Sequence, residues 1–407
     1  MTDRVIVIGA GHAAGQLSAR LRAEKYEGGV VIVGDELVLP YQRPPLSKAY
    51  MAGEIGLERV VMRTQKFYDD NNIDVRTGVR ATAIDTSART VTLDSGESLE
   101  YSHAVIATGA RARTLPLDGA ELSGIHVLRS LADSDAVGSV LDMTKRMVVV
   151  GGGYIGLEVA AVARKRGLEV VVLETMERIL ARTTSARTAR HVADVHASNG
   201  VEIRLKARVS SFRGDDAGHV DGVVLDGGEV VAADIVVLGV GVLPNEELAA
   251  EAGLKVDNGV VVDARGATSE PNVWAVGDCT RHPSRIYDKQ IRLESVQNAM
   301  SQAKVVAANI AGNDSDYDEV PWFWTDQYDM KLQSVGLIDD ADEFVTRGDP
   351  SSGSFSVFAL QGGCVIGAEN VNSMREHMEC RRLAGAQAKV DAATLADPKT
   401  VLKQLSR

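Results

Sequence analysis

Two glycine-rich segments have the residue types and spacing that suit the phosphates of a dinucleotide. Each follows a run of apolar residues (5–8 and 147–150) and precedes a helical pattern, and each has the form G-x-G-x-x-G/A. The first glycine makes a tight turn, the second lets a pyrophosphate approach the backbone, and the third small residue lets helix and strand pack closely. The helix N-terminus then presents N–H groups and a positive dipole end to phosphate. The three key positions are Gly9, Gly11 and Ala14 in the first copy and Gly151, Gly153 and Gly156 in the second.

An acidic residue follows each copy where a ribose contact is expected. Asp35 comes 26 residues after Gly9, and Glu174 comes 23 residues after Gly151, each at the end of a second apolar run. A single copy could be a glycine-rich turn without a ligand, but two copies with their acids disfavour that alternative. The sequence therefore predicts two dinucleotide sites.

The second site favours NAD over NADP. Glu174 and the nearby Glu177 would repel a 2′-phosphate. Arg178 and Arg182 lie close in sequence, but they also suit a solvated helix or loop. The first site suits a tightly bound flavin, because later strand patterns at 105–110, 234–245 and 268–278 end in small or polar residues at positions where ligands gather in open α/β sheets.

These patterns predict an α/β fold with two Rossmann-like domains, one for FAD and one for NAD, plus a C-terminal α+β domain. We expect a discontinuous FAD domain at 1–111 and 236–320, an inserted NAD domain at 112–235, and a C-terminal domain at 321–407. In the last, 331–337, 344–347, 355–360 and 365–369 have strand patterns, and a helix follows from about Ser373. Residues 312–316 form a polar linker candidate before it.

Composition narrows the function. The chain has 407 residues, 45% of them apolar, and a net charge of −12, which disfavours a nucleic-acid or anionic-membrane binder. The three cysteines are far apart, without metal or dithiol spacing, so we expect no metal site. The N-terminal residues lack a leader pattern, and no apolar run is long enough to span a bilayer. We expect a cytoplasmic protein.

Four further segments carry a resemblance. They are YQRPPLSK at 41–48, GGGYIGLE at 151–158, ESVQNA at 294–299 and PWFWTDQY at 321–328. With the two fingerprints they resemble the two-dinucleotide flavoproteins related to glutathione reductase. More narrowly, they are similar to NADH:ferredoxin reductases of the putidaredoxin reductase and aromatic-ring dioxygenase type. The resemblance implies hydride transfer from NADH to FAD, then single-electron transfer to a 2Fe–2S ferredoxin that feeds a haem-thiolate monooxygenase or a ring-hydroxylating dioxygenase.

The resemblance also implies roles for three side chains. It places Lys48 near the flavin N5 and O4, Glu158 near the nicotinamide and able to pair with Lys48, and Trp324 against the isoalloxazine. A cation near the flavin would stabilise charge on the reduced ring. The alternatives are a lysine that caps a solvated helix, a glutamate on an exposed helical turn, and a core tryptophan, a place that Trp322 fits better.

The same transfer gives the remaining contacts. For FAD these are Gly9, Gly11, His12, Ala13, Ala14, Asp35, Arg43, Lys48, Ala81, Ala107, Thr108, Gly109, Arg129, Gly277, Asp278, Val296 and Trp324. Val296 would contribute its backbone at the start of a helix. For NAD the contacts are Gly151, Gly153, Tyr154, Ile155, Gly156, Glu158, Glu174, Gly239 and Gly241. The mechanism requires no general base, so we interpret histidine side chains as structural.

A missing thiol sets the direction of electron flow. Dithiol and peroxide-reducing members of the superfamily carry cysteine in the segment that corresponds to residues 44–48, and this chain has none there. Electrons must therefore leave the protein, and Cys279 suits a buried turn. The alternatives are an NADH oxidase or peroxide reductase, which the missing cysteine disfavours, and a redox-responsive interaction protein similar to apoptosis-inducing factor. The latter would need long insertions and a basic face.

The expected partner is acidic, and so is this chain. Docking of a 2Fe–2S ferredoxin would need a local basic patch, for which Lys304 and Lys331 are candidates, with Arg285 and Arg292 behind them. Ordinary surface charges are an equally good interpretation of each. We expect a monomer or weak dimer.

Overall fold

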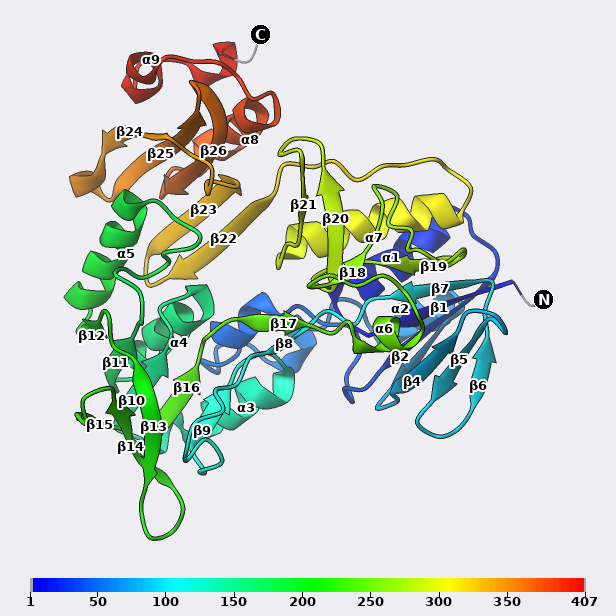
Figure 1. Cartoon of the computed structure of the whole chain (residues 1–407), viewed down its shortest axis with the longest axis horizontal. Helices are drawn as coiled ribbons and strands as arrows, with labels where there is room; N and C mark the ends of the chain where they lie inside the picture. Colours follow the sequence, from blue (N-terminus) through cyan, green and yellow to red (C-terminus); the bar gives the residue numbers. More distant parts are fainter. Residues whose placement is uncertain (1–2, 406–407) are drawn as a thin grey trace. The chain divides into compact units, whose positions relative to one another are not determined.

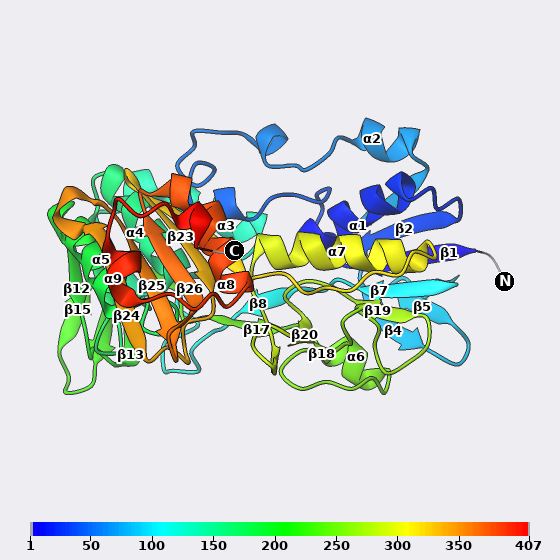
Figure 2. The same cartoon turned by 90° about the horizontal axis from the view of Figure 1, so that it is seen from above.

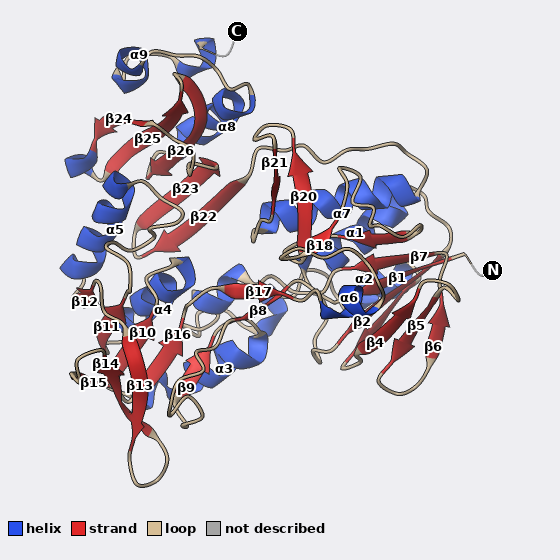
Figure 3. Cartoon of the chain, viewed as in Figure 1, coloured by secondary structure: helices blue, strands red, loops and turns tan. Residues whose placement is uncertain are grey.

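The computed structural model describes residues 3–405 in two compact units (Figure 1). Among the described residues, the first comprises 3–43, 56–111 and 242–319, and the second comprises 44–55, 112–241 and 320–405. Each unit contains both helices and strands (Figure 3).

The first unit contains a parallel sheet with strands ordered β19 (Val273–Ala275), β7 (His103–Ile106), β1 (Arg4–Ile8), β2 (Gly29–Gly34) and β3 (Ile73–Thr77). Helices α1 (His12–Ala23) and α7 (Val296–Ile310) lie side by side (Figure 2). Strand β1 is buried on both faces, because Val5 and Val7 join one apolar cluster and Ile6 and Ile8 join another. A continuous apolar run is typical of a parallel strand with both faces covered.

Smaller elements complete the first unit. Antiparallel strands β4 (Ala81–Asp85), β5 (Thr90–Leu93) and β6 (Ser98–Glu100) form one sheet, and β18 (Val260–Val261), β20 (Thr280–Ser284) and β21 (Lys289–Ile291) form another. Helices α2 (Gln65–Asp70) and α6 (Glu247–Glu251) are short. Strands β8 (Ala110–Ala112) and β17 (Val242–Pro244) stand at the ends of its chain segments.

The second unit repeats the parallel design, with strands ordered β12 (Val201–Arg204), β11 (Glu169–Leu173), β10 (Arg146–Val150), β16 (Ile235–Leu238) and β9 (Ile125–Val127). Helices α3 (Leu131–Val140), α4 (Tyr154–Lys165) and α5 (Ala186–Ser198) belong to the same unit, as do the antiparallel strands β13 (Val209–Gly214), β14 (Val220–Leu225) and β15 (Val230–Ala232). Apolar residues of β10, β11 and α4 share one cluster with Phe355 and Val357 of the C-terminal part.

The C-terminal part of the second unit is an antiparallel sheet with order β22 (Trp322–Gln327), β23 (Met330–Gly336), β26 (Cys364–Val371), β25 (Ser354–Gln361) and β24 (Glu343–Asp349). Helices α8 (His377–Gly385) and α9 (Ala392–Ala396) follow it. The four strands predicted here are confirmed, with small shifts at their ends. Strand β22 was not predicted, because its residues were interpreted only as a motif.

The predicted α/β class with an α+β C-terminal part is confirmed, but one segment was assigned wrongly. The run at 234–245 was grouped with the flavin strands, whereas β16 pairs in parallel with β10, with Val148 opposite Val236. Because the pairing is long-range, the apolar pattern of the strand alone could not reveal which sheet it joins. Between residues 3 and 405, no helix is long and apolar enough to cross a membrane.

A buried arginine fastens the C-terminal segment to the sheet. The Arg347 side chain is 7% exposed and forms an ion pair with Glu376 at 2.8 Å. Its guanidinium also donates to carbonyl oxygens of the segment that includes α9, namely those of Leu395, Asp397, Pro398 and Thr400. A planar guanidinium with five donors can satisfy several carbonyl groups at once, so Arg347 replaces the regular backbone pairing that this segment lacks.

We expect Arg347→Met to lower the free energy of unfolding by about 3 kcal/mol, because it removes the guanidinium donors from the carbonyl oxygens of this segment and from Glu376, which then keeps the Ser356 hydroxyl as a donor. Urea denaturation of the purified protein measures the change. The exposed Arg375→Met variant is the control. Equal stability of the two variants would contradict the anchoring role of Arg347.

Candidate functional site

The first glycine-rich turn has the geometry of a phosphate cradle. Gly9 has φ 110°, and a Cβ there would overlap the carbonyl group of Ala107. A Cβ at Gly11 would meet no heavy atom within 4 Å among residues 3–405, and α1 begins at the next residue without a described side-chain cap. Open space at a helix N-terminus fits a pyrophosphate. The predicted residues His12, Ala13 and Ala14 form the first turn of this helix.

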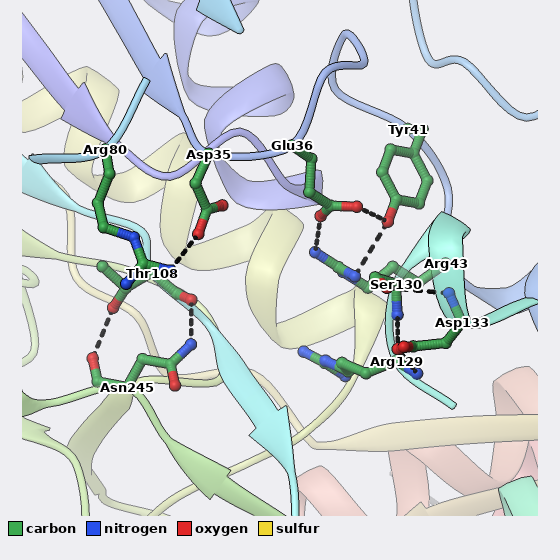
Figure 4. A network of polar contacts seen from close by, with 10 residues as sticks. All are labelled: Asp35, Glu36, Tyr41, Arg43, Arg80, Thr108, Arg129, Ser130, Asp133 and Asn245. Atoms are coloured by element: carbon green, nitrogen blue, oxygen red, sulfur yellow. Dashed lines mark hydrogen bonds and ion pairs between the residues drawn. The ribbon is translucent and has the colours of Figure 1, made fainter. Parts of the chain in front are cut away.

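Two residues far apart in sequence, Thr108 and Asn245, are joined by hydrogen bonds (Figure 4). The Thr108 hydroxyl donates to the Asn245 backbone oxygen at 2.7 Å, and the Asn245 side-chain amide donates to the Thr108 backbone oxygen at 2.9 Å. The Asn245 N–H also donates to the Gly109 oxygen at 3.0 Å. These bonds fix the chain direction after β7, where the predicted residues Ala107, Thr108 and Gly109 lie. In the sequence analysis, Asn245 is covered only as the last residue of the pattern at 234–245.

The predicted ribose acid already has a partner. The Asp35 side chain is 58% exposed and pairs with Arg80 at 3.0 Å (Figure 4). The next residue, Glu36, pairs with the predicted Arg43 at 2.9 Å and accepts a hydrogen bond from the Tyr41 hydroxyl at 2.6 Å. Glu36 and Tyr41 were missed as possible site residues, although an acid beside Asp35 was a visible signal.

A buried glutamine holds the turn that carries Asp278. The Gln302 side-chain oxygen accepts from the Gly277 N–H at 2.7 Å and from the Thr280 hydroxyl at 2.9 Å. Its amide nitrogen lies 3.0 Å from the His282 Nδ1, so it donates to that atom. Burial lowers the pKa of His282 to about 4. Gln302 was missed, and the signal was a polar residue on the buried face of a helix.

Other predicted flavin contacts of the first unit occupy strand and helix ends. Ala81 begins β4, and Val296 begins α7, whose N-terminus is capped by the Ser295 side chain. The structure thus brings the fingerprint, Ala107–Gly109 and Gly277–Asp278 to the same end of the parallel sheet, since β1, β7 and β19 run in parallel.

The second glycine-rich turn repeats the first. Gly151 has φ 109°, and a Cβ at Gly156 would overlap the Gly151 carbonyl. At Gly153 a Cβ would come no closer than 3.8 Å to the nearest described atom, the Gly239 oxygen. The predicted acid Glu174 accepts from the Gly152 N–H at 2.8 Å and from the Met176 N–H at 2.8 Å. The carboxylate therefore shapes the turn.

The remaining predicted nucleotide contacts lie around this turn. Tyr154 and Ile155 open α4, and Gly239 and Gly241 follow β16. Burial raises the pKa of Tyr154 to about 12, so its hydroxyl stays neutral. Its ring packs on Phe323 of β22 with 4.4 Å between ring centroids.

A buried carboxylate with several partners lies on α4 of the second unit. Glu158 is 4% exposed, and its Oε1 forms an ion pair with the Lys48 Nζ at 2.7 Å. The same oxygen accepts from the Thr325 hydroxyl at 2.6 Å, and Oε2 accepts from the Ser47 hydroxyl. The predicted pairing of Lys48 with Glu158 is confirmed. The alternative of an exposed helical turn is wrong, because Glu158 lies on the buried face of α4.

The predicted tryptophan lies on the strand that supplies Thr325. Trp324 is half-buried, with its ring centroid 5.5 Å from that of Trp322. Trp322 packs against the C-terminal apolar cluster, as expected of a core residue. In the same unit, Arg129 precedes α3, and its backbone N–H donates to Asp133 at 2.9 Å (Figure 4).

The four cations predicted to contact an acidic partner differ in their exposure and in whether they already pair with an acid. Lys304 on α7 and Lys331 on β23 are exposed. Arg285 pairs with Asp318 at 3.0 Å, and the 14% exposed Arg292 pairs with Glu294 at 2.7 Å.

Cys279 is a buried free thiol whose pKa is raised by burial, as its turn position suggested. The described residues contain no cluster of His, Cys, Asp or Glu suited to a metal.

The two parallel sheets thus each present a cradle that an adenine dinucleotide fits. The open space at Gly11 and Gly153, each followed by a helix, is the observation that carries this statement. A flavin bound at the first would supply hydride-accepting and electron-transfer chemistry, and a nicotinamide nucleotide at the second would supply the hydride.

Comparisons with known proteins point the same way. The model of the pyridine nucleotide-disulphide oxidoreductase family matches residues 3–303, and that of the reductase C-terminal family matches residues 322–406. Rhodocoxin reductase of Rhodococcus erythropolis is 42% identical over 399 residues, which cover 98% of this chain and 93% of that protein.

Two solved structures have nearly the same fold. A ferredoxin reductase for the CYP199A2 system from Rhodopseudomonas palustris has a TM-score of 0.97 and 40% identity, covering 100% of both chains. A covalent putidaredoxin reductase–putidaredoxin complex has a TM-score of 0.96 and 38% identity, covering 99% of this chain and 98% of that one.

We expect Gly153→Ala to weaken nucleotide binding and Gly156→Ala to lower thermal stability. The Gly153 methyl fits the protein but fills the space of the pyrophosphate, so the Kd for nicotinamide nucleotide should rise about 10-fold or more at unchanged Tm. The Gly156 methyl overlaps the Gly151 carbonyl, so Tm itself should fall. Titration calorimetry and thermal unfolding separate the effects. Gly138→Ala on α3 is the control, and nucleotide affinity unchanged in Gly153→Ala would contradict the cradle.

The buried His282 predicts a pH dependence of stability. Its pKa is about 4 in the folded protein and about 6.5 in an unfolded chain, so the unfolded chain binds the proton first as pH falls. The contribution is complete above pH 6.5 and is lost between about pH 6.5 and 4, amounting to about 3 kcal/mol. His282→Gln should flatten this part of the curve. Urea denaturation at several pH values checks it.

A curve for His282→Gln that overlays the wild-type curve would show that His282 does not carry the effect.

Proposed function

The chain belongs to the pyridine nucleotide-disulphide oxidoreductase family, and we propose that it is an FAD-dependent NADH:ferredoxin oxidoreductase that feeds an oxygenase. The family uses a flavin and a nicotinamide nucleotide, and the chain is an oxidoreductase of the ferredoxin reductase type. The observation that carries the proposal is the buried Lys48–Glu158 pair in a segment that has no cysteine at 44–48.

FAD and NADH are the proposed cofactors. FAD is supported by the cradle at Gly9 and Gly11 and by the strand ends around Thr108 and Asp278. NADH is favoured over NADPH because Glu174 directly follows β11 at the expected ribose position, where its carboxylate would repel a 2′-phosphate. The contacts expected of the other site residues remain proposals of the same kind.

Each of these site residues has a defined task in this proposal. Gly11 and Gly153 let the pyrophosphates approach helix N-termini, which hold them. The Lys48 ammonium supplies positive charge where negative charge develops on the reduced ring, and Glu158 orients that ammonium. Trp324 offers an aromatic face on β22. No residue has to move a proton, so the protein acts by positioning and electrostatics.

The partner is proposed to be a 2Fe–2S ferredoxin. A solved relative is a covalent complex of putidaredoxin reductase with putidaredoxin, which supports a protein electron acceptor. Exposed Lys304 and Lys331 are the candidates for contact with an acidic partner, because Arg285 and Arg292 already pair with acids. We also propose a monomer or weak dimer that acts in the cytoplasm without nucleic acid or membrane partners.

Three domains are proposed within this function. The FAD domain would comprise 1–111 and the chain that follows the NAD domain to 320, the NAD domain would begin at 112, and the C-terminal domain would comprise 321–407. We place the end of the NAD domain after β16 instead of at 235, because β16 pairs with β10.

NADH-driven cytochrome c reduction with and without a 2Fe–2S ferredoxin tests the function. We expect the rate to rise at least about 10-fold with ferredoxin, because the flavin has no local thiol acceptor. NADPH should give a lower kcat/KM than NADH. Fast NADH consumption with oxygen or peroxide alone would instead support an oxidase or peroxide reductase. Negligible turnover with every acceptor would support a redox-responsive interaction protein.

A further inference from the structure

Beyond Lys48 and Glu158, the second unit contains a row of buried polar side chains that the proposed reaction leaves without a task. They are His196 on α5 and Thr325 and Gln327 on β22, with exposed fractions of 0%, 0% and 1%. The burial pattern of β22 places Thr325 and Gln327 on its inner face, two residues apart. Buried polar groups are costly unless they bond to one another, so their arrangement is specific.

These side chains form one continuous chain of hydrogen bonds. The His196 Nε2 lies 2.7 Å from the Gln327 Oε1, and the Gln327 Nε2 donates to the Thr325 Oγ1 at 3.1 Å. The Thr325 hydroxyl donates to the Glu158 Oε1 at 2.6 Å, the oxygen that also receives the Lys48 ammonium. This series of hydrogen bonds thus connects helix α5 with the carboxylate on α4 through strand β22.

The donors and acceptors of these groups allow only one direction of donation along this series of hydrogen bonds, from His196 towards Glu158. An amide oxygen only accepts, so the His196 Nε2 must carry the hydrogen that it shares with Gln327. The Gln327 N–H then occupies a lone pair of Thr325, which leaves the single hydroxyl hydrogen of Thr325 for Glu158. If the amide were reversed, Thr325 would have to donate to Gln327, and Glu158 would lose a donor.

The structure also favours a neutral His196. Its Nδ1 is buried, and among residues 3–405 it has no hydrogen-bond partner, so a second N–H there would be unsatisfied. Burial lowers the pKa of this imidazole, against a smaller opposing effect of its hydrogen bond to Gln327. The Tyr328 ring contacts it edge-on, with 5.2 Å between centroids.

We propose that His196, Gln327 and Thr325 are positioning residues for the reductase reaction, forming a directional relay that fixes the Glu158 carboxylate and, through it, the Lys48 ammonium. This inference rests on the proposed function, in which Lys48 supplies charge near the flavin. Thr325 is the last donor and carries the effect, while Gln327 and His196 set the direction in which its hydroxyl points. Chains of hydrogen bonds strengthen one another in a low-dielectric interior.

The tautomer of His196 tests the direction of the relay without any turnover. Nitrogen-15 NMR of histidine-labelled protein, assigned with His196→Asn, should show a neutral imidazole with hydrogen on Nε2 in the full chain at pH 7. Hydrogen on Nδ1 would reverse the relay and overturn the proposal. This measurement does not depend on which protein accepts the electrons.

A pair of Thr325 variants tests the consequence. Thr325→Val keeps the volume and removes the hydroxyl, whereas Thr325→Ser keeps the hydroxyl. Stopped-flow reduction of the bound flavin by NADH, without ferredoxin, should be about 10-fold slower in Thr325→Val and within about 2-fold of wild type in Thr325→Ser. The KM for NADH should stay near the wild-type value in both variants, since the nucleotide contacts are unchanged. The Tm should stay near the wild-type value in Thr325→Ser and fall in Thr325→Val, because Glu158 and Gln327 each lose a hydrogen-bond partner there.

Equal rates for the valine variant and wild type would overturn the proposal, and so would a valine-like rate for the serine variant. If Thr325→Val does not fold, the wild-type tautomer decides. Failure of the proposed function is recognised separately, because it would appear as a wild-type protein whose flavin is reduced by NADH but which does not pass electrons to ferredoxin.

Discussion

The burial of one charged pair constrains the whole second unit. The Glu158 carboxylate lies inside the protein, where an ion without partners would cost several kcal/mol. Its partners come from two other places in the chain: Ser47 at the end of the 3-10 helix η1 (Pro44–Ser47) with Lys48 directly after it, and Thr325 on β22. The nucleotide-binding sheet and the C-terminal sheet must therefore pack in one arrangement for the pair to be satisfied, which joins folding to the proposed chemistry.

Local sequence predicted those parts of the site whose geometry is local. A strand, a tight turn at Gly151 and a helix at Tyr154 follow one another along the chain, so their types and spacing suffice. The buried network was not predictable in this way, since Thr325 and Glu158 are 167 residues apart and His196 and Gln327 are 131 apart. Alternating polar residues on an inner strand face were its only local sign. The sheet to which β16 belongs is likewise a matter of long-range pairing.

The acids at the ends of β2 and β11 show how far a motif reaches. Glu174 bonds to the backbone of its own glycine-rich turn, so in the second sheet the acid also shapes the fingerprint. Asp35 instead pairs with Arg80 on the surface, while its neighbour Glu36 holds Arg43. The spacing identified the strand end correctly in both copies, but local partners decide how available each carboxylate is to a ligand.

The segment at 44–48 joins the electron path to the electrostatics of the site. This segment contains Ser47 and Lys48 and no cysteine, and both of these residues donate to the Glu158 carboxylate. A hydroxyl and an ammonium cannot accept electrons, so this segment can only hold charge in place. In the proposed function, the segment that lacks a thiol acceptor therefore also supplies donors for the carboxylate. The relay from His196 ends at the same carboxylate, which makes Glu158 the point where the C-terminal sheet can influence the proposed reaction.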